Sequence, residues 1–184
     1  TVPLVVPEIN PEEAQNHSGI IANPNCTTIV TLMGLNPLHK KWKALNIIAS
    51  SYQAVSGSGA QGIEELKSQI NAIANGNEIE KKVYPCQIAH NVIPQVDIFL
   101  ENGYTKEEMK MENEGRKILG TPNLKASVTC VRVPVYRSHS IAVTAQFASE
   151  PDIEEARILI DQADGVGSAA RRARWSSSSR CCSR

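Results

Sequence analysis

The sequence predicts an α+β fold, in which a mixed and mainly antiparallel sheet carries helices on one face. Apolar runs typical of strands occupy residues 45–52, 124–136 and 141–147. Helical patterns stand before and between these runs, but strands and helices do not alternate in the regular way of a doubly wound parallel sheet. The last two strand-like runs follow each other across the bend 137–140, which favours an antiparallel hairpin.

Composition and charge exclude several classes of function. Of the 184 residues, 41% are hydrophobic and 21% charged, as in ordinary globular proteins, and no apolar run is long enough to cross a bilayer. Residues 1–164 carry 14 basic and 19 acidic side chains, so they offer no basic stripe for nucleic acid. The five cysteines include no Cys-x-x-Cys pair, and no histidine stands at the spacing of metal ligands. We therefore expect free thiols, no metal site, and a reducing compartment such as the cytoplasm or a plastid stroma.

Three segments of the chain differ in composition. Residues 1–17 contain three prolines and predict an extended segment that ends a preceding domain. The first residue is not methionine, so we expect the chain to begin inside a longer protein. Residues 18–164 predict a folded domain. Residues 165–184 are rich in Ser and Arg and contain no acid, which predicts a disordered tail.

The first folded stretch places a cysteine at the start of a helix. Residues 19–22 predict a short buried strand, Asn23 and Pro24 a turn, and residues 27–41 an apolar helix that Pro37 breaks or bends. Cys26 therefore lies in the first helical turn, where unpaired N–H groups and the positive end of the helix dipole favour a thiolate. Most lone cysteines are small buried hydrophobes. The strand, turn and helix around this one favour a nucleophile.

Residues 23–28, Asn-Pro-Asn-Cys-Thr-Thr, resemble the active-site segment of the aspartate-semialdehyde dehydrogenases, whose cysteine forms a thioacyl intermediate. The related N-acetyl-glutamyl-phosphate reductases have a segment like Asn-Pro-Gly-Cys-Tyr-Pro-Thr, so Asn25 and Thr27 favour the aspartate branch. The resemblance implies that residues 1–17 are the exit from a dinucleotide-binding domain that this chain lacks. It implies that residues 18–164 are the catalytic and dimerisation domain, with the fold of the second domain of glyceraldehyde-3-phosphate dehydrogenase, and that this domain forms a homodimer. It also implies a small-molecule substrate and NADP(H) as cofactor.

The predicted strand 45–52 leads into a polar, glycine-rich loop at residues 53–62, and residues 63–73 predict a helix. The run Tyr-Gln-Ala-Val-Ser-Gly-Ser-Gly resembles a family loop in which the Gln orients the substrate and the Ser-Gly pair touches the nicotinamide. The resemblance thus implies a catalytic Gln53. It also implies cofactor contacts from Asn25, Ser56 and Gly57.

Thr105 and Glu108 form a capping box that predicts a helix to about Leu119. Glu114 and Lys117 are three residues apart and share one face of this helix. The segment resembles the family element Glu-Thr-x-Lys-Ile, with Gly in place of Thr at position 115. The resemblance implies that Glu114 binds the substrate amine and Lys117 the phosphate.

Residues 130–140 resemble the family signature Arg-x-Pro-Val-x-x-x-His-Ser, including its seven-residue step from Arg132 to His139. The resemblance implies that Arg132 binds the α-carboxylate of the substrate and that His139 is the general acid and base. After this signature, Ser149 is the expected N-cap of a last helix, with Pro151 in its first turn.

The implied reaction begins when Cys26 attacks aspartyl-4-phosphate and phosphate leaves. NADPH then reduces the thioester to aspartate semialdehyde, a step in the biosynthesis of lysine, threonine and methionine. No Gly-x-x-Gly-x-x-Gly turn follows a strand, so we expect the main NADP site to lie outside this chain and the chain alone to be nearly inactive as a reductase. Two alternatives stay open: a non-catalytic dimerisation module derived from this enzyme, and N-acetyl-glutamyl-phosphate reductase chemistry.

Overall fold

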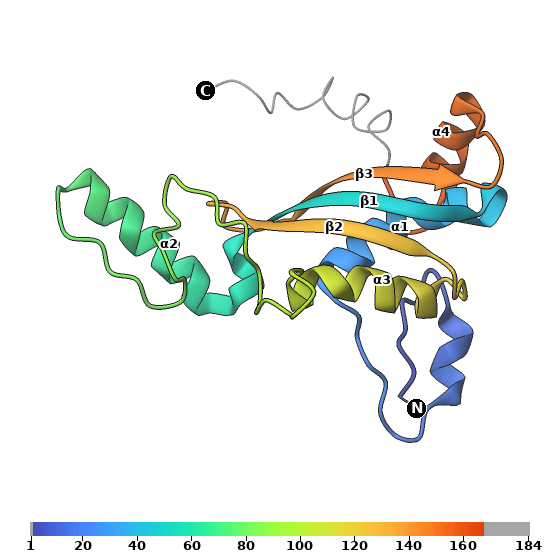
Figure 1. Ribbon diagram of the computed structural model, residues 1–184, viewed down its shortest axis with the longest axis horizontal. Helices are drawn as coiled ribbons and strands as arrows, with labels where there is room; N and C mark the ends of the chain where they lie inside the picture. Colours follow the sequence, from blue (N-terminus) through green and yellow to red (C-terminus); the bar gives the residue numbers. More distant parts are fainter. Residues whose placement is uncertain (1, 168–184) are drawn as a thin grey trace. The chain divides into compact units, whose positions relative to one another are not determined.

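The computed structural model describes residues 2–167 (Figure 1). The elements in order are the 3-10 helix η1 (Pro11–Asn16), α1 (Cys26–Trp42), β1 (Ala44–Gln53), the 3-10 helix η2 (Val55–Ser58), α2 (Gly59–Ala74), α3 (Lys106–Ile118), β2 (Lys125–Arg132), β3 (Ser140–Phe147) and α4 (Ile153–Gln162). This order confirms the predicted α+β class. The predicted disordered tail lies, from residue 168 on, outside the described residues.

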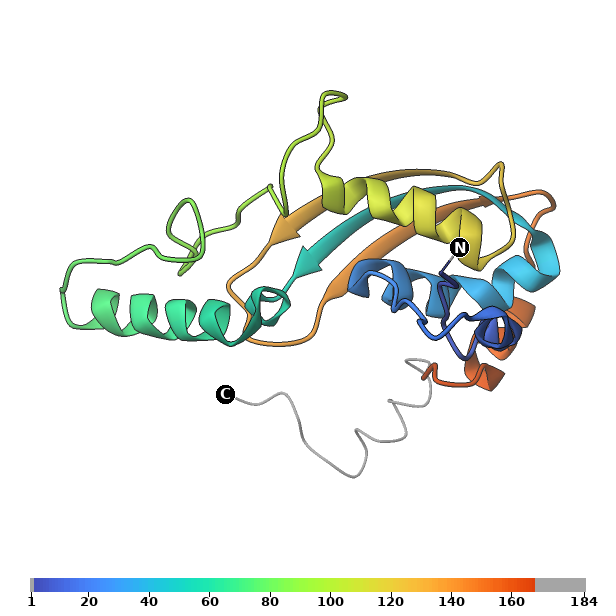
Figure 2. The ribbon, with the colours of Figure 1, turned by 90° about the horizontal axis from the view of Figure 1, so that it is seen from below.

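The three strands form one mixed sheet in the order β2-β1-β3. Strands β1 and β2 point in the same direction and β3 in the opposite one (Figures 1 and 2). The central strand β1 therefore has one parallel and one antiparallel neighbour. A mixed sheet was expected.

The predicted hairpin of the last two strands is wrong, because β2 and β3 both pair with β1 and not with each other. The connection between them runs across the end of β1. The N–H of Val133 donates to the carbonyl of Gln53 at 2.9 Å, and the N–H of Val55 donates to the carbonyl of Val135 at 2.9 Å. These bonds carry the chain past β1 before β3 begins.

The described chain divides into two compact units. The first unit comprises residues 2–46, 114–125 and 145–167, and the second comprises residues 47–113 and 126–144.

In the first unit, α1 is a single helix that continues through Pro37. The predicted break at this proline is wrong, because the residues on both sides of it pack: Leu35 and Trp42 are 5% and 6% exposed. The Trp42 ring meets that of Phe147 edge-on at 6.4 Å. Helix α4 packs against α1, and Lys41 forms an ion pair with Glu155 at 2.7 Å.

The segment before α1 differs from the predicted buried strand. Ala22 makes one parallel bridge with Leu4, and the side chains of Ile20 and Ile21 are exposed. Residues 1–17 were expected to be extended, but residues 7–9 form a turn and residues 11–16 form η1. Pro11 is the first residue of η1, where a helix does not need the N–H group that proline lacks.

In the second unit, strand β1 separates a buried face from an exposed one. Ile47, Ala49 and Gln53 are buried, whereas Ile48 on the opposite face is 63% exposed. Tyr52, four residues after Ile48 on the same face of β1, is also exposed. The sheet therefore carries exposed apolar side chains on this face, as expected for a dimerising domain.

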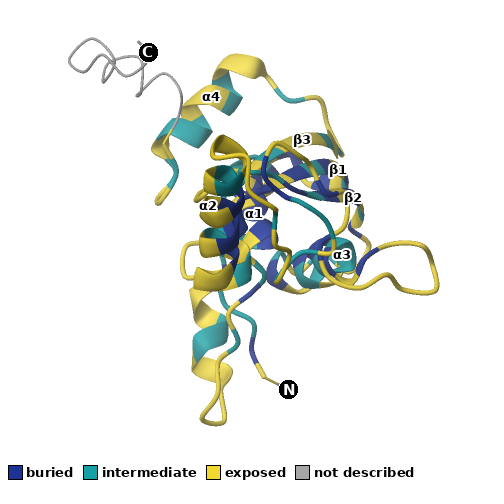
Figure 3. Ribbon diagram, turned by 90° about the vertical axis from the view of Figure 1, so that its left-hand side faces the viewer, coloured by how far each residue is buried: buried dark blue, intermediate teal, exposed yellow. Residues whose placement is uncertain are grey.

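The glycine-rich stretch after β1 is more ordered than the predicted loop, because η2 and α2 follow at once. Helix α2 places buried residues on one side and exposed residues on the other (Figure 3). Its Gly62 is required by packing, since a Cβ there would lie 2.6 Å from the carbonyl oxygen of Val55. The core of the unit is a cluster of Val55, Leu66, Ile88, Ala89 and Ile93.

Helix α3 begins with the predicted capping box. The N–H of Thr105 donates to Glu108 at 2.7 Å, and the N–H of Glu108 donates to the Thr105 hydroxyl at 3.3 Å. Helix α4, by contrast, is capped by Asp152 and not by Ser149, because the Asp152 carboxylate accepts the N–H of Glu155 at 2.8 Å. Over residues 2–167, no helix is both long enough and apolar enough to cross a membrane.

Candidate active site

The structure confirms that Cys26 starts a helix. Asn25 is the N-cap of α1, and its side-chain oxygen accepts the N–H groups of Thr27 at 3.0 Å and Thr28 at 3.3 Å. The Cys26 side chain is exposed. An exposed thiol beside the positive end of a capped helix is placed as a nucleophile requires.

Two further predicted residues belong to the same unit. The Glu114 carboxylate accepts the N–H of Asn25 at 2.9 Å and so ties the end of α3 to the turn before Cys26. Lys117, one helical turn further on, is exposed and donates to the carbonyl of Val2 at 2.8 Å. Within this unit, Glu114 is thus held beside the residue that precedes the thiol.

In the second unit, Ala54 anchors two predicted side chains. The N–H of Ala54 donates to Nδ1 of His139 at 3.1 Å, and the carbonyl oxygen of Ala54 accepts from Nη1 of Arg132 at 2.8 Å. Ala54 directly follows Gln53 along the chain. The structure therefore holds Arg132 and His139 on the residue that directly follows Gln53.

The contact with Ala54 also defines the state of the His139 ring. Because Nδ1 accepts a hydrogen bond, the neutral ring carries its proton on Nε2. Burial and then the Arg132 charge lower the pKa of His139 below its ordinary 6.5, while the Glu107 charge acts in the opposite direction. A neutral imidazole at physiological pH can accept a proton, as a general base must.

Arg132 is largely buried, with 7% of its surface exposed, and its guanidinium carbon lies 6.0 Å from the ring centroid of Tyr84. Ala54 accepts from only one of its nitrogens. Among residues 2–167, Ala54 is the one hydrogen-bond acceptor of the guanidinium. The remaining N–H groups keep the fork geometry that suits a carboxylate.

Gly57 lies against the same two side chains. A Cβ at this position would be 2.8 Å from Nη1 of Arg132 and 3.3 Å from the ring of His139. The glycine is therefore needed for the close approach of these side chains. The N–H groups of Ser56 and Gly57 already donate to the carbonyls of Tyr136 and Ala54, both at 3.1 Å, so they are not available to a cofactor.

The other cysteines of the described chain differ from Cys26. Cys86 is partly buried, and Cys130 is fully buried in β2. Burial raises the pKa of the Cys130 thiol to about 11, against the smaller effects of hydrogen bonds with Ser51 and Gln53. Cys130 is thus a packing residue. Within residues 2–167, no group of His, Cys, Asp or Glu is arranged to hold a metal ion.

Sequence reasoning missed the residues that support this group. Glu107 is buried and accepts from Nε2 of Gln53 at 3.1 Å, and Ser51 lies 3.3 Å from the same nitrogen. In the sequence, Glu107 is distinguished only as a second glutamate next to Glu108 of the capping box. Glu107 meets Gln53, which lies 54 positions earlier in the chain, and no local sequence pattern reveals such a contact.

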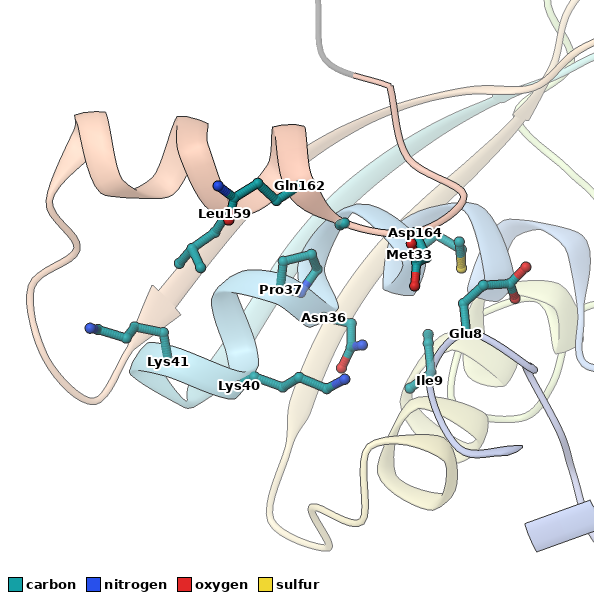
Figure 4. A pocket seen from close by; sticks show the side chains of 11 residues that line it. Glu8, Ile9, Met33, Asn36, Pro37, Lys40, Lys41, Leu159, Gln162 and Asp164 are labelled. Atoms are coloured by element: carbon teal, nitrogen blue, oxygen red, sulfur yellow. The ribbon is translucent and has the colours of Figure 1, made fainter. Parts of the chain in front are cut away.

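A surface hollow in the first unit contains none of the predicted site residues (Figure 4). Met33, Pro37 and Leu159 form apolar parts of its wall, and Lys40 and Asp164 bring charges of both signs. The hollow holds no nucleophile. We assign it no role in the reaction.

The predicted residues are divided between the two units. The first unit holds Asn25, Cys26, Glu114 and Lys117, and the second holds Gln53, Ser56, Gly57, Arg132 and His139.

Known proteins resemble this chain in sequence. The family described as "Semialdehyde dehydrogenase, dimerisation domain" matches residues 35–169. The aspartate-semialdehyde dehydrogenase of Aquifex aeolicus is 48% identical over 168 residues, which make up 90% of this chain and 49% of that protein. The chain spans about half the length of the curated relatives it matches.

Solved structures resemble the fold. Aspartate semialdehyde dehydrogenase II of Vibrio cholerae, complexed with ASA, superimposes with a TM-score of 0.86 at 45% identity and covers 89% of this chain and 49% of its own. Aspartate semialdehyde dehydrogenase of Candida albicans with NADP gives a TM-score of 0.61 at 24% identity, over 94% and 47% of the two chains. The second likeness shows the fold alone.

Proposed function

The chain belongs to the aspartate-semialdehyde dehydrogenase family, a family of oxidoreductases, and from this premise we propose that it performs acyl transfer from aspartyl-4-phosphate to Cys26. The observation that carries the proposal is the double anchor at Ala54, which holds an arginine and a neutral histidine beside Gln53. An acidic acyl phosphate needs a cation to bind it, a nucleophile to attack it and a group to move protons.

The proposed step begins with attack of the Cys26 sulfur on the acyl carbon. A C–S bond forms, the C–O bond to phosphate breaks, and phosphate leaves with the bonding electron pair. His139 takes the thiol proton and returns protons at later stages. The Arg132 guanidinium binds the α-carboxylate, and Gln53 orients the acyl group.

Two residues of α3 complete the proposed substrate contacts. Glu114 binds the α-ammonium group, since an ionised carboxylate only accepts hydrogen bonds. Lys117 binds the phosphate as a point charge. Glu114 already accepts the N–H of Asn25, next to Cys26, which supports this assignment.

NADP(H), when bound, supplies the hydride that converts the thioester to the aldehyde. Asn25, Ser56 and Gly57 are the proposed contacts of this chain with the nicotinamide end, through side chains or carbonyls, because the N–H groups of Ser56 and Gly57 are engaged. Gly57, Gly59 and Gly62 stand between β1 and α2 at the spacing Gly-x-Gly-x-x-Gly. A Cβ at Gly57 would lie 2.8 Å from Nη1 of Arg132, and one at Gly62 would lie 2.6 Å from the carbonyl oxygen of Val55, so both glycines serve internal packing and do not by themselves make a dinucleotide site. We therefore propose that this chain alone has little reductase activity.

The proposed assembly is a homodimer formed through the exposed sheet face. The exposed side chains of Ile48 and Tyr52 provide apolar surface for such an interface. The matched family description, a dimerisation domain, supports the same assembly. In the whole enzyme, the proposed product feeds the biosynthesis of lysine, threonine and methionine.

One alternative is a dimerisation module without catalysis, which also fits the matched family description, a dimerisation domain. Mass spectrometry of the chain after incubation with aspartyl-4-phosphate distinguishes acyl transfer from a module without catalysis. We expect one aspartyl group on Cys26, and hydroxylamine should remove it because it is a thioester. The Cys26→Ser variant should lack this group, and the control Cys86→Ser should carry it. If the wild-type chain stays unmodified, or if the adduct also forms in Cys26→Ser, acyl transfer to Cys26 is contradicted. The dimerisation module without catalysis is then the function that remains.

A further inference from the structure

We propose that Glu107 is a positioning residue that fixes the side-chain amide of Gln53 in one orientation. The role of Glu107 follows from contacts within the second unit alone. Its consequence for the substrate rests on the proposed function.

Glu107 is held firmly in place. It lies in the first turn of α3 and is only 7% exposed. Its Oε2 accepts from the ammonium of Lys110 at 3.0 Å, and Lys110 also pairs with Asp97 at 3.6 Å. A buried carboxylate is costly unless it is paired and hydrogen-bonded, and Lys110 meets that need.

The other oxygen of Glu107 faces Gln53. Nε2 of Gln53 donates to Oε1 of Glu107 at 3.1 Å and lies 3.3 Å from the Ser51 hydroxyl oxygen. An amide nitrogen has two N–H groups and an ionised carboxylate has none, so the nitrogen must face Glu107. The Gln53 side chain is 1% exposed and has no room to reorient freely.

The amide oxygen of Gln53 consequently points away from Glu107. Glu107 thereby sets the orientation in which the Gln53 amide acts on the acyl group of the proposed substrate.

Glu107 also influences His139 by charge. Arg132 on β2 and burial favour the neutral ring, whereas the Glu107 carboxylate on α3 favours the protonated one. Both charged groups belong to the second unit with His139. Removing the Glu107 charge should therefore lower the pKa of His139 further, which a merely structural role for Glu107 would not do.

The test compares Glu107→Gln with Glu108→Gln in the full 184-residue chain. Glu108 is the matched control, because it is the same residue on the same turn but accepts only backbone N–H groups, those of Thr105 and Cys130. A glutamine at 107 can turn either end toward Gln53 and no longer dictates its orientation. Glu107→Ala removes the acceptor outright.

Two readouts are used. NMR follows the side-chain amide protons of Gln53, identified by their loss in Gln53→Met, and the titration of the His139 ring. Mass spectrometry follows the rate of Cys26 acylation by aspartyl-4-phosphate. In both Glu107 variants we expect shifted Gln53 amide signals, a lower His139 pKa and acylation about tenfold slower, with Glu108→Gln like the wild type.

Unchanged Gln53 signals in both Glu107 variants overturn the positioning role, whatever the acylation rate. Equal changes in Glu108→Gln also overturn it, because the effect would then belong to α3 as a whole. If the wild-type chain is not acylated at all, the proposed function fails, and the NMR comparison alone still decides the role of Glu107.

Discussion

At the scale of single residues, Ala54 connects two side chains that lie seven positions apart in the sequence. Its N–H donates to His139 and its carbonyl accepts from Arg132, so one backbone unit sets the position of both. Gly57 completes the arrangement by leaving space for them. The geometry of the site thus depends on backbone atoms as much as on the functional side chains.

Gly57→Ala should slow Cys26 acylation by about tenfold or more, because a new Cβ would lie 2.8 Å from Nη1 of Arg132. The thermal midpoint should change little, since the end of a long side chain can move. Gly34→Ala is the control, because a Cβ there meets nothing within 4 Å. Acylation of Gly57→Ala at the wild-type rate would contradict the close packing.

The pH dependence of stability should reflect His139. Its pKa is lowered in the folded chain, by burial first and by Arg132 second, so the unfolded chain binds a proton more readily. Stability should therefore fall as the pH decreases from 6.5 toward the folded pKa, and then level off. Urea unfolding above and below this pH measures the slope, and His139→Gln should reduce it. A slope that His139→Gln leaves unchanged would assign the effect to another group, such as His39, whose pKa is also lowered by burial and by Lys43.

At the scale of elements, the sequence predicted correctly those features that depend on interactions between residues close together in the chain. The capping box of α3 and the helix at Cys26 were predicted, because each depends on residues within one turn. The hairpin was not, because the pairing of β2 and β3 with β1 joins segments far apart in the chain. Pro37 did not break α1, since tertiary packing on both sides outweighs one missing hydrogen bond.

Asn25→Ala should lower the free energy of unfolding by about 1 kcal/mol, because it removes the acceptor for the N–H groups of Thr27 and Thr28. Asn25→Asp keeps an acceptor and should retain most of the stability. Urea unfolding of the three proteins tests the cap. Equal losses in both variants would show that the asparagine acts in another way.

At the scale of the whole molecule, signatures of the family supplied the candidate site residues, and the catalytic roles of these residues stay predictions. The contacts around them could not be predicted in this way. Glu107 and Glu108 are adjacent and chemically identical, yet one faces Gln53 and the other caps a helix. Only the packing of α3 against β1 in the second unit separates the two roles.

The proposed homodimer predicts that Ile48→Glu makes the chain monomeric, because Ile48 is 63% exposed on the apolar sheet face. Ile153→Glu is the control, since Ile153 is similarly exposed, at 68%, but lies on α4. Light scattering after size-exclusion chromatography measures the mass. A dimer that survives Ile48→Glu would place the interface elsewhere.

The proposed function requires that Cys26, Arg132 and His139 serve one reaction. The most direct test is the initial rate of Cys26 acylation by aspartyl-4-phosphate, followed by intact mass, in wild type, Arg132→Gln and Arg137→Gln. Arg137 is exposed, five residues beyond Arg132, and is the matched control. We predict that Arg132→Gln is acylated at least about tenfold more slowly while Arg137→Gln matches the wild type. Equal rates in all three proteins would contradict the claim.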